Sequence, residues 1–332
     1  MCGRRAVIEE GSQMKEGKPK ILVVGSMNMD LIMYNVERIP KMGESIYCTG
    51  YEYVTGGKGS NQAYAASMQG ADAYLVGRIG TDDNGRALMK QLEEAGVDTS
   101  FVVRDEGHLT GLSTMNIDAD GNYFSIFASG ANDHIKPEDV ERAMDQVDFD
   151  MVVMQLEMPL ETVYQTYGMA RQREIPVFLD AGPAMSIPLE RLRGIFIISP
   201  NEAETAALTG IVPDTKAHTE EAARWLYEKA APRYVLLKLG SRGALLYDGR
   251  EMKWVKGYHV DAVDTTAAGD TFGAALAVQY CKGADMETAI RYGHAAAAIC
   301  VTRKGGHPSI PTAKEVERFL LENKVGRREQ NK

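Results

Sequence analysis

Short apolar runs and longer stretches with helical spacing alternate along most of the chain. The apolar runs are each followed by a glycine or a polar residue, and they lie at 20–24, 151–154, 177–179, 195–198 and 234–237. The stretches with helical spacing lie at 137–144, 160–173, 202–209 and 219–229. Continuous apolar strands that alternate with amphipathic helices are typical of a parallel sheet covered by helices on both faces. The pattern therefore predicts an α/β fold built on a doubly wound, mostly parallel sheet.

Three other segments alternate apolar and polar residues. They are 45–55, 110–117 and 123–128, and the last two flank a turn-forming sequence at 118–122. Such alternation indicates strands with one face in contact with solvent, and the turn indicates a hairpin. We therefore expect a small, mostly antiparallel lid sheet, drawn from about 45–55 and 110–128. It could close over a ligand or pair with a second subunit.

The length and the charge of the chain limit the kinds of protein that it can be. Its 332 residues suggest two domains, or one large α/β domain with an appendage. The net charge of −9 argues against a general nucleic-acid surface, so any bound phosphate must be held locally. The chain has no run of about 18 apolar residues, and its first twenty residues lack the apolar stretch of a signal peptide. These features predict a protein without a membrane partner.

The cysteines and the two ends of the chain add expectations about setting and boundaries. The spacing of the four cysteines suits neither a zinc site nor a disulfide framework, which favours a reducing, cytoplasmic setting. They are Cys2, Cys48, Cys281 and Cys300. From the polar and charged ends we expect a flexible extension over 1–19, a folded domain over 20–324 and a frayed tail over 325–332.

Segment 264–272, Asp-Thr-Thr-Ala-Ala-Gly-Asp-Thr-Phe, has the strongest chemical signal. It follows a strand-like stretch at 257–263 and opens a helical run over 272–280. Small residues at a helix start leave backbone N–H groups uncovered, and these donors and the helix dipole favour an anion. A carboxylate at Asp270 would compete with a phosphate there, unless it takes a proton from a hydroxyl that attacks the phosphate. An ordinary helix start with an acidic first turn stays open as the alternative.

The same segment resembles the signature of the ribokinase family of sugar and nucleoside kinases, and the resemblance extends over about residues 20–321. It implies a ribokinase-like domain with a lid, and ATP-dependent phosphorylation of D-ribose at O5 to give D-ribose 5-phosphate. It also implies an anion hole for the transferred phosphate, formed by Ala267, Ala268 and Gly269. Asp270 matches the catalytic base, which contacts both the sugar and the nucleotide.

A second motif, Gly-Gly-Lys-Gly-Ser-Asn-Gln at 56–62, precedes a helical run at 63–68. It matches neither the Walker A pattern nor the dinucleotide-binding pattern of glycines. A tight turn between a strand and a helix would explain it equally well. The resemblance instead assigns it to the sugar pocket, where Lys58 and Asn61 hydrogen-bond hydroxyl groups. The implied pocket residues are Gly57, Lys58, Gly59, Ser60 and Asn61.

Polar residues also follow two of the predicted strands. They lie at 25–30, after the first strand, and at 155–157, after the strand at 151–154. Ligands of parallel sheets bind at the carboxyl ends of strands, although turn-forming residues and solvated charges are common there too. The resemblance implies a carboxylate at Asp30 that holds two hydroxyl groups. The sugar-binding residues that it implies here are Asn28, Met29, Asp30 and Glu157.

Three segments resemble the nucleotide side of the family's site. The sequence Asn-Glu-Ala-Glu at 201–204 matches a motif that organises Mg²⁺ and its waters around ATP, and Glu204 is expected to bind Mg²⁺ through water. The glycine-containing loop 238–243 is expected to pass close to the nucleotide, with a plain hairpin turn as the alternative. His294 is expected near the adenine, with a packing role as the alternative. The implied ATP-binding residues are Asn201, Lys238, Leu239, Gly240, Ser241, Arg242, Gly243, Gly269, Asp270 and His294.

Segment 302–309 resembles the loop that completes a monovalent-cation site in the family. Such a site needs oxygen atoms more than particular side chains. By resemblance, K⁺ would lie under the anion hole and set its shape without touching substrate. The implied ligands are the backbone carbonyls of Asp264, Thr266, Cys300, Arg303 and Gly305, and the hydroxyl of Ser309.

Several alternatives stay open. Asp180 stands where ribokinases carry an asparagine, so 2-deoxyribose, a hexose or a nucleoside is an alternative substrate. A sugar-binding sensor without catalysis would have no need for Asp270. An NAD-dependent dehydrogenase would suit the sheet, but no dinucleotide fingerprint follows the first strand. Because half-apolar lid strands would expose a sheet face in a monomer, and the family often pairs its lids, we expect a homodimer formed through the lid.

Overall fold

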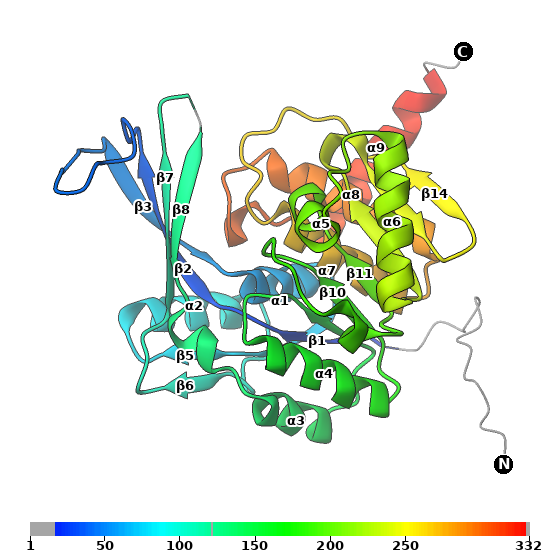
Figure 1. Cartoon of the computed structure of the whole chain (residues 1–332), viewed down its shortest axis with the longest axis horizontal. Helices are drawn as coiled ribbons and strands as arrows, with labels where there is room; N and C mark the ends of the chain where they lie inside the picture. Colours follow the sequence, from blue (N-terminus) through cyan, green and yellow to red (C-terminus); the bar gives the residue numbers. More distant parts are fainter. Residues whose placement is uncertain (1–16, 121, 330–332) are drawn as a thin grey trace.

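A computed structural model describes residues 17–120 and 122–329, and it contains a large sheet between layers of helices with a smaller sheet at one side (Figure 1). In these residues the large sheet has eight strands, in the order β14-β13-β12-β11-β10-β9-β1-β4. The strands from β4 to β12 pair in parallel, and β13 and β14 are antiparallel. Their bounds are β1 Lys20–Val24, β4 Asp72–Val76, β9 Met151–Met154, β10 Val177–Asp180, β11 Ile197–Ser199, β12 Tyr234–Lys238, β13 Ala244–Tyr247 and β14 Met252–Val255. The five predicted apolar runs all lie in this sheet, and the mostly parallel α/β fold is confirmed.

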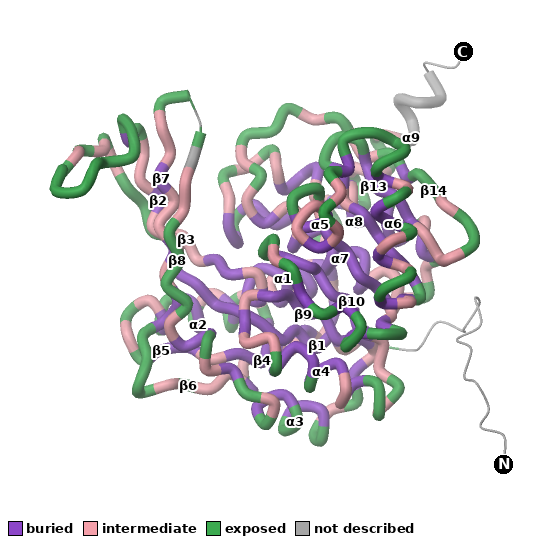
Figure 2. The backbone as a smooth tube through the Cα atoms, viewed as in Figure 1, coloured by how far each residue is buried: buried purple, intermediate pink, exposed green. Residues whose placement is uncertain are grey.

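Helices cover both faces of the large sheet, because its strands are apolar on both sides. One core joins alternate strand residues, such as Val23 and Val153, to the helices α1 Lys58–Met68, α2 Asp83–Glu94, α7 Ala268–Cys281 and α8 Met286–Val301. The other core joins the intervening residues, such as Val24 and Val152, to α3 Pro137–Gln146, α4 Leu160–Gln172, α5 Glu202–Thr209 and α6 Lys216–Ala230. Figure 2 shows both cores as buried backbone around the sheet. The last helix, α9 Ala313–Glu329, packs on α8.

The lid is a four-stranded sheet in the order β3-β2-β7-β8, and it projects from the large sheet at the upper left of Figure 1. Its strands are β2 Asn28–Tyr34, β3 Gly50–Gly56, β7 Gly111–Ile117 and β8 Tyr123–Ala128. The predicted hairpin is confirmed by the antiparallel pairing of β7 with β8. Strand β3 begins only at Gly50, so the predicted strand over 45–49 is wrong.

Strand β2 was not predicted as a lid strand. Residues 25–30 were expected to end the first strand, but β1 ends at Val24 and a separate strand starts at Asn28. It pairs antiparallel with β3 and parallel with β7, so Asn28 and Asp30 belong to the lid. Their place therefore depends on pairing with segments that are distant in sequence.

Other boundaries also differ from the expectations. Residues 257–263 form no strand, because no neighbouring segment hydrogen-bonds to them as a ladder. Helix α9 continues to Glu329, beyond the expected end of the folded domain at residue 324. Most of the predicted N-terminal extension, residues 1–16, lies outside the described residues, as do residues 330–332. In the part of the chain that the structure describes, no helix has the length and apolar character needed to cross a membrane.

Smaller elements complete the fold. A two-stranded sheet joins β5 Arg78–Gly80 to β6 Val103–Asp105. The short 3₁₀ helices are η1 Gly130–His134, η2 Leu189–Leu192, η3 Gly240–Arg242 and η4 His307–Ser309. Three of them lie in loops that reach the candidate site described next.

Candidate active site

The carboxyl ends of the parallel strands bring polar side chains together at one edge of the large sheet. Ser26 follows β1, and its hydroxyl donates a 2.5 Å hydrogen bond to Glu157, which follows β9. Asp180 ends β10 and Lys238 ends β12, and the two side chains form an ion pair. This is the edge where parallel α/β sheets bind ligands. The site therefore begins as a row of strand ends.

Asp270 lies in the first turn of α7, above this row, and it is buried. Its carboxylate accepts hydrogen bonds from Asn61 Nδ2 at 2.9 Å and from Gln62 Nε2 at 3.1 Å, both on α1. Lys58 Nζ lies 3.9 Å from Asp270 Oδ1. Burial raises the pKa of Asp270 to about 6, although Lys58 opposes that rise. Such a carboxylate can exchange a proton near neutral pH.

The N-terminus of α7 offers backbone N–H groups beside Asp270. Residue Ala267 precedes the helix with φ +60° and has no polar side chain to cap it. A Cβ on Gly269 would lie 3.7 Å from Lys238 Nζ, so the ammonium group is close to the first turn. Helix amides and a nearby ammonium are both favourable for an anion. The predicted anion hole is thus an uncapped helix start with a lysine beside it.

Asp180 is a buried carboxylate between two lysines, and sequence reasoning noted it only as a departure from the family pattern. Its Oδ2 lies 3.5 Å from Lys58 Nζ and accepts a 3.1 Å hydrogen bond from Gln62 Nε2. Burial by itself would raise the pKa of Asp180, but Lys238 and Lys58 hold it below its usual value. Lys238 Nζ also lies 3.7 Å from Glu204 Oε2. Asp180 therefore stays charged and holds both lysines in the site.

A second group of polar residues lies at the base of the lid, where Asp30 is close enough to Glu157 and Asp270 to interact with their charges. Asp30 on β2 accepts a hydrogen bond from Ser113 on β7. Burial raises the pKa of Asp30 to about 6, and the nearby carboxylates Glu157 and Asp270 add to the rise. Asn28 Oδ1 accepts a 2.7 Å hydrogen bond from Asn132, a residue in η1 that sequence reasoning missed.

The predicted sugar-binding turn packs tightly against the end of β1. Gly57 has φ +89°, and a Cβ on Gly59 would lie 2.5 Å from the backbone carbon of Gly25. Only glycine fits both positions. Ser60 is buried, and its hydroxyl bonds to the carbonyl oxygen of Gly57 at 3.2 Å. The turn therefore depends on glycine at positions 57 and 59, because a side chain at either would meet the backbone that follows β1.

Met29 differs from its neighbours in the predicted pocket. Because side chains alternate along a strand, Met29 faces away from Asn28 and Asp30. It is buried in the hydrophobic core shared with α1 and α2. The structure brings together the other predicted sugar residues but not the side chain of Met29.

Comparison with known proteins shows what kind of enzyme has this arrangement. Residues 18–313 match the pfkB family of carbohydrate kinases. The chain belongs to this family. It is 35% identical over 301 residues to a ribokinase of Bacillus subtilis, covering 90% of this chain and 99% of the relative. It is also 32% identical over 305 residues to a deoxyribokinase of Salmonella typhi, covering 91% and 99%.

A solved structure of Arabidopsis thaliana ribokinase, complexed with ribose and ATP, has the same fold. The TM-score is 0.84 at 33% sequence identity, and the match covers 92% of this chain and 99% of that one. The resemblance to the ribokinase family is thus confirmed, and the chain is an ATP-dependent sugar kinase.

On the predicted nucleotide side of this pfkB kinase, Asn201 and Glu204 cap the start of α5. Glu204 N donates to Asn201 Oδ1 at 2.9 Å, and Asn201 N donates to Glu204 Oε2 at 2.7 Å. This reciprocal pair holds a buried carboxylate near Lys238, whose ammonium group lies close to the first turn of α7. A carboxylate with an adjacent amide oxygen suits Mg²⁺, which prefers oxygen ligands and retains waters.

The loop after β12 and His294 in the middle of α8 complete the predicted nucleotide residues. Residues Leu239 to Gly243 form a tight turn closed by a 2.9 Å hydrogen bond from Leu239 N to Gly243 O. Arg242 points away to contact Glu202 at 3.2 Å. The Nε2 atom of His294 is buried and, within the described residues, has no hydrogen-bond partner. Burial lowers the pKa of His294 to about 4, so its imidazole is neutral.

The segments predicted to form the cation loop lie against each other. Gly305 N donates to Asp264 Oδ2 at 2.9 Å, and the thiol of Cys300 lies 3.1 Å from Ser309 Oγ. The same thiol lies 3.7 Å from the carbonyl oxygen of Thr266. In residues 17–120 and 122–329, no cluster of three His, Cys, Asp or Glu side chains could hold a metal. Of the implied oxygen ligands, the carbonyl oxygen of Thr266 and the hydroxyl of Ser309 thus both lie against the Cys300 thiol.

Proposed function

We propose that this sugar kinase transfers the γ-phosphoryl group of ATP to O5 of D-ribose and so produces D-ribose 5-phosphate. The observation that carries the proposal is the place of Asp270. Its carboxylate lies between the polar groups of the lid and the uncapped start of α7, and it has a pKa of about 6. The ribokinase relatives, and the Arabidopsis structure complexed with ribose and ATP, support ribose as the sugar.

Asp270 would act as the general base. It accepts the proton of the sugar hydroxyl as that oxygen attacks the phosphorus atom. The amides of Asn61 and Gln62 hold its two oxygens, which leaves little freedom for the carboxylate to turn away. At pH 7.5 a carboxyl group with a pKa of about 6 is mostly ionised and ready to accept a proton.

The start of α7 would stabilise the phosphate. The backbone N–H group of Gly269, the helix dipole and the Lys238 ammonium offset the charge of the transferring group. The N–H group of Ala268, also implied for this role, donates to the carbonyl oxygen of Thr265 at 3.2 Å in the structure. Lys58 lies between Asp180 and Asp270, at the boundary between sugar and phosphate. Because phosphoryl transfer depends mainly on positioning and charge, these groups provide most of what the reaction needs.

Two ions belong to the proposal. Glu204 and Asn201 would hold Mg²⁺ through water, and the ion would supply positive charge to the ATP phosphates. The carbonyl oxygens of Asp264, Thr266 and Cys300, with their neighbours in the loop, would hold K⁺ under the α7 start. There the chain's own contacts already tie residue 264 to residue 305, so the loop keeps the anion hole in shape.

The lid would close the sugar pocket and form a dimer. Asn28 and Asp30 on its inner face, and Glu157 at the edge of the large sheet, would bind sugar hydroxyls. Exclusion of water there protects the phosphoryl group from hydrolysis. On the outer face, Tyr53 is 59% exposed and Ile126 is 64% exposed. An exposed apolar sheet face supports pairing of two lids. Tyr53→Lys should convert the dimer to a monomer in sedimentation velocity; an unchanged dimer would contradict the lid interface.

A second substrate, 2-deoxyribose, is favoured by one observation. The deoxyribokinase relative is nearly as similar to this chain as the ribokinase relatives are. The two sugars differ only in the 2-hydroxyl. The comparison of kcat/KM for ribose and for 2-deoxyribose therefore separates the two candidates.

The test is ADP release with ribose, 2-deoxyribose, fructose or adenosine as acceptor, in MgCl₂ with KCl or with NaCl. We expect the highest kcat/KM with ribose and a higher rate in KCl. Highest turnover with 2-deoxyribose would replace the substrate but retain the mechanism. Sugar binding without any ADP release would overturn the catalytic proposal in favour of a sensor.

A further inference from the structure

The loop 305–309 contacts both ends of the candidate site. At one end Gly305 N bonds to Asp264, just before the α7 start. At the other end Gly306 lies against the lid, where an added Cβ would be 2.4 Å from Val54 Cγ1 and 2.9 Å from the carbonyl oxygen of Thr55. The loop therefore joins the phosphate side to the place where β3 turns into α1.

His307 is the residue of this loop with the most contacts to other elements. It is fully buried, and its Nε2 lies 3.2 Å from Ser60 Oγ in the sugar-binding turn. Its Nδ1 lies 3.1 Å from Thr55 Oγ1 on β3 and 2.9 Å from Gln91 Oε1 on α2. Its ring stacks on Tyr64 of α1 with centroids 4.5 Å apart. One side chain thus joins the lid, the sugar turn and two helices.

The ring does this in its neutral form. Burial lowers the pKa of His307 to about 3, so it is uncharged at neutral pH. A neutral imidazole has one donor and one acceptor nitrogen, and partners lie at both. In a buried site, loss of Ser60 would leave Nε2 unpaired, whereas Nδ1 has both Thr55 and Gln91 as partners. The ring therefore fixes the relative positions of Ser60 and Thr55.

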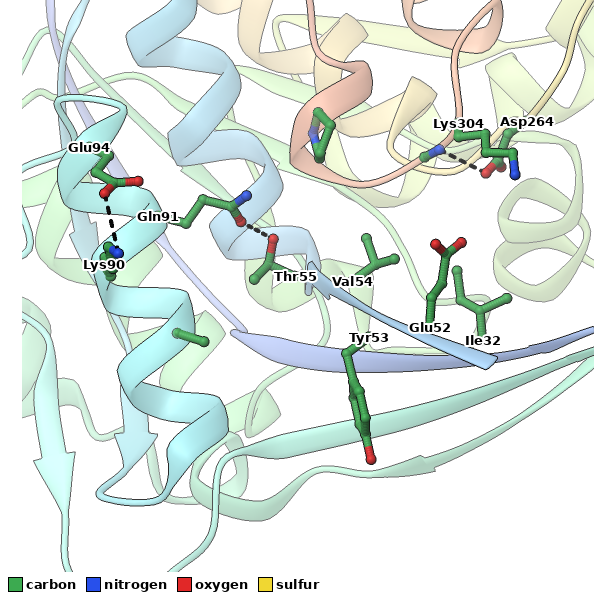
Figure 3. A pocket seen from close by; sticks show the side chains of 13 residues that line it. Ile32, Glu52, Tyr53, Val54, Thr55, Lys90, Gln91, Glu94, Asp264 and Lys304 are labelled. Carbon is green, nitrogen blue, oxygen red and sulfur yellow. Dashed lines mark hydrogen bonds and ion pairs between the residues drawn. The ribbon is translucent and has the colours of Figure 1, made fainter. Parts of the chain in front are cut away.

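A groove next to this cluster separates α2 from the loop at 304–308. It has a volume of about 480 Å³ and lies between β3, α2 and the loop at 304–308. Figure 3 shows Gln91 of α2 reaching Thr55 across its floor, with Lys304 and Asp264 on the other side. Because open space separates α2 from the loop there, the contacts of His307 are a main connection between them.

We propose that His307 is a positioning residue that couples sugar binding to nucleotide binding, an inference that rests on the proposed function. The loop 305–309 makes contacts on both sides of the site. His307 holds Ser60 and Thr55 on the sugar side, and Gly305 holds Asp264, three residues before Ala267, on the phosphate side. Sugar that orders the turn at 56–60 also orders the loop, and the loop orders the α7 start for ATP. Coupling of this kind is reciprocal.

The experiment is isothermal titration calorimetry of ribose binding, with and without a saturating non-hydrolysable ATP analogue, at constant MgCl₂ and KCl. In the wild type we expect the analogue to tighten ribose binding about tenfold, within the usual range for coupled sites. His307→Ala should reduce that factor to about twofold or less. His307→Gln, whose amide supplies a donor and an acceptor, should recover most of it.

Two other variants separate coupling from general damage. Tyr292→Phe removes a buried 3.0 Å hydrogen bond to Gln69 away from the site, and it should leave the factor unchanged. Thr55→Val removes one partner of His307 while the histidine stays, so it tests the idea if His307→Ala fails to fold. We expect it to reduce the factor at least threefold.

Three outcomes would overturn the coupling: no effect of the analogue in the wild type, a wild-type factor in both His307→Ala and Thr55→Val, or an equal loss in Tyr292→Phe. Failure of the proposed function is recognised separately. In that case the wild type shows no ribose binding or phosphorylation, and the same titrations are made with the sugar that it does phosphorylate.

Discussion

Two buried aspartates of the candidate site have pKa values that are shifted in opposite directions. Asp180 at the end of β10 and Asp270 in the first turn of α7 accept hydrogen bonds from the same amide group of Gln62. Both are buried, yet the pKa of Asp180 is lowered and that of Asp270 is raised to about 6. The difference comes from Lys58 and Lys238, which lie close to Asp180, whereas only Lys58 reaches Asp270, and at 3.9 Å.

This difference separates Asp180, which holds two lysines, from Asp270, which we propose as the base. A carboxylate between two lysines stays ionised and holds them, but it is a poor proton acceptor. A buried carboxylate with one distant lysine is destabilised in its charged form and accepts a proton readily. Burial also raises the pKa of Asp30, on the lid, to about 6. Lysine placement, not burial alone, therefore divides the site into two parts.

The largest expected effect is the loss of the base. Asp270→Asn keeps the shape of the side chain but cannot accept the hydroxyl proton, so kcat should fall about 10²–10⁴-fold. The dissociation constant for ribose should change less than about fivefold, since most sugar contacts remain. Steady-state rates and calorimetry measure the two quantities. A kcat within a factor of three of wild type would show that Asp270 is not the base.

Asp180→Asn should affect stability most strongly. It leaves two buried lysines without their shared partner, which costs about 3–5 kcal/mol of the free energy of unfolding. Urea denaturation at pH 7.5 measures this loss. Adding Lys238→Met should recover part of it. The matched control is Asp145→Asn, at an ion pair with Arg173 in which Asp145 is 59% exposed, where the loss should stay below about 1 kcal/mol. Equal losses at the two positions would contradict the anchor role.

The pH dependence of catalysis tests whether the pKa of Asp270 is raised. The base must be ionised, so kcat/KM should fall as the pH drops through about 6. The positive charge of Lys58 lowers the pKa of Asp270, so Lys58→Met should move this acid limb to higher pH. Lys90→Met, at an exposed lysine on α2, is the control and should leave the limb in place. A limb near pH 4 in the wild type would contradict the raised pKa.

The smallest expected effect is the change in stability when Asp30 loses its charge. Its pKa rises from 3.8 to about 6 on folding, so the folded state binds the proton more tightly than the unfolded state. Its contribution to stability is therefore favourable at low pH and lost as the pH rises from about 4 to above 6. Asp30→Asn should stabilise the protein by about 1–3 kcal/mol at pH 7.5. Thermal unfolding at pH 4 should show almost no difference. Destabilisation at pH 7.5 would mean that the Ser113 contact outweighs the cost of burial.

Regular patterns made much of the fold predictable. The large sheet was predicted because its strands are buried on both faces and read as continuous apolar runs. The hairpin of β7 and β8 was predicted from alternation and a turn. Strand β2 was missed because its sequence, Asn-Met-Asp-Leu-Ile-Met-Tyr, follows β1 closely and alternates poorly. The strand-like stretch at 257–263 has no partner, and a strand needs one to satisfy its backbone.

The candidate site was predictable where a motif is local. The start of α7, the turn at 57–61 and the pair Asn201 and Glu204 each lie within a few residues. Small residues at a helix start indicated an anion site at the first, and the family resemblance implied the roles of the other two. Asp180, Gln62 and His307 were not predicted as functional residues. Their contacts join residues 58 to 252 positions apart, and nothing in the local sequence indicates them.

The sequence by itself determined the periodicity of the elements, the glycines that permit close approach and the family to which the chain belongs. These depend on neighbouring residues, whose spacing and conformational freedom are already present in the unfolded chain. Only the tertiary structure decided which aspartate is the anchor and which has the raised pKa. Burial and charge pairing depend on distances between residues that are far apart in sequence, and those distances exist only once the sheet edge, the lid and α7 have come together.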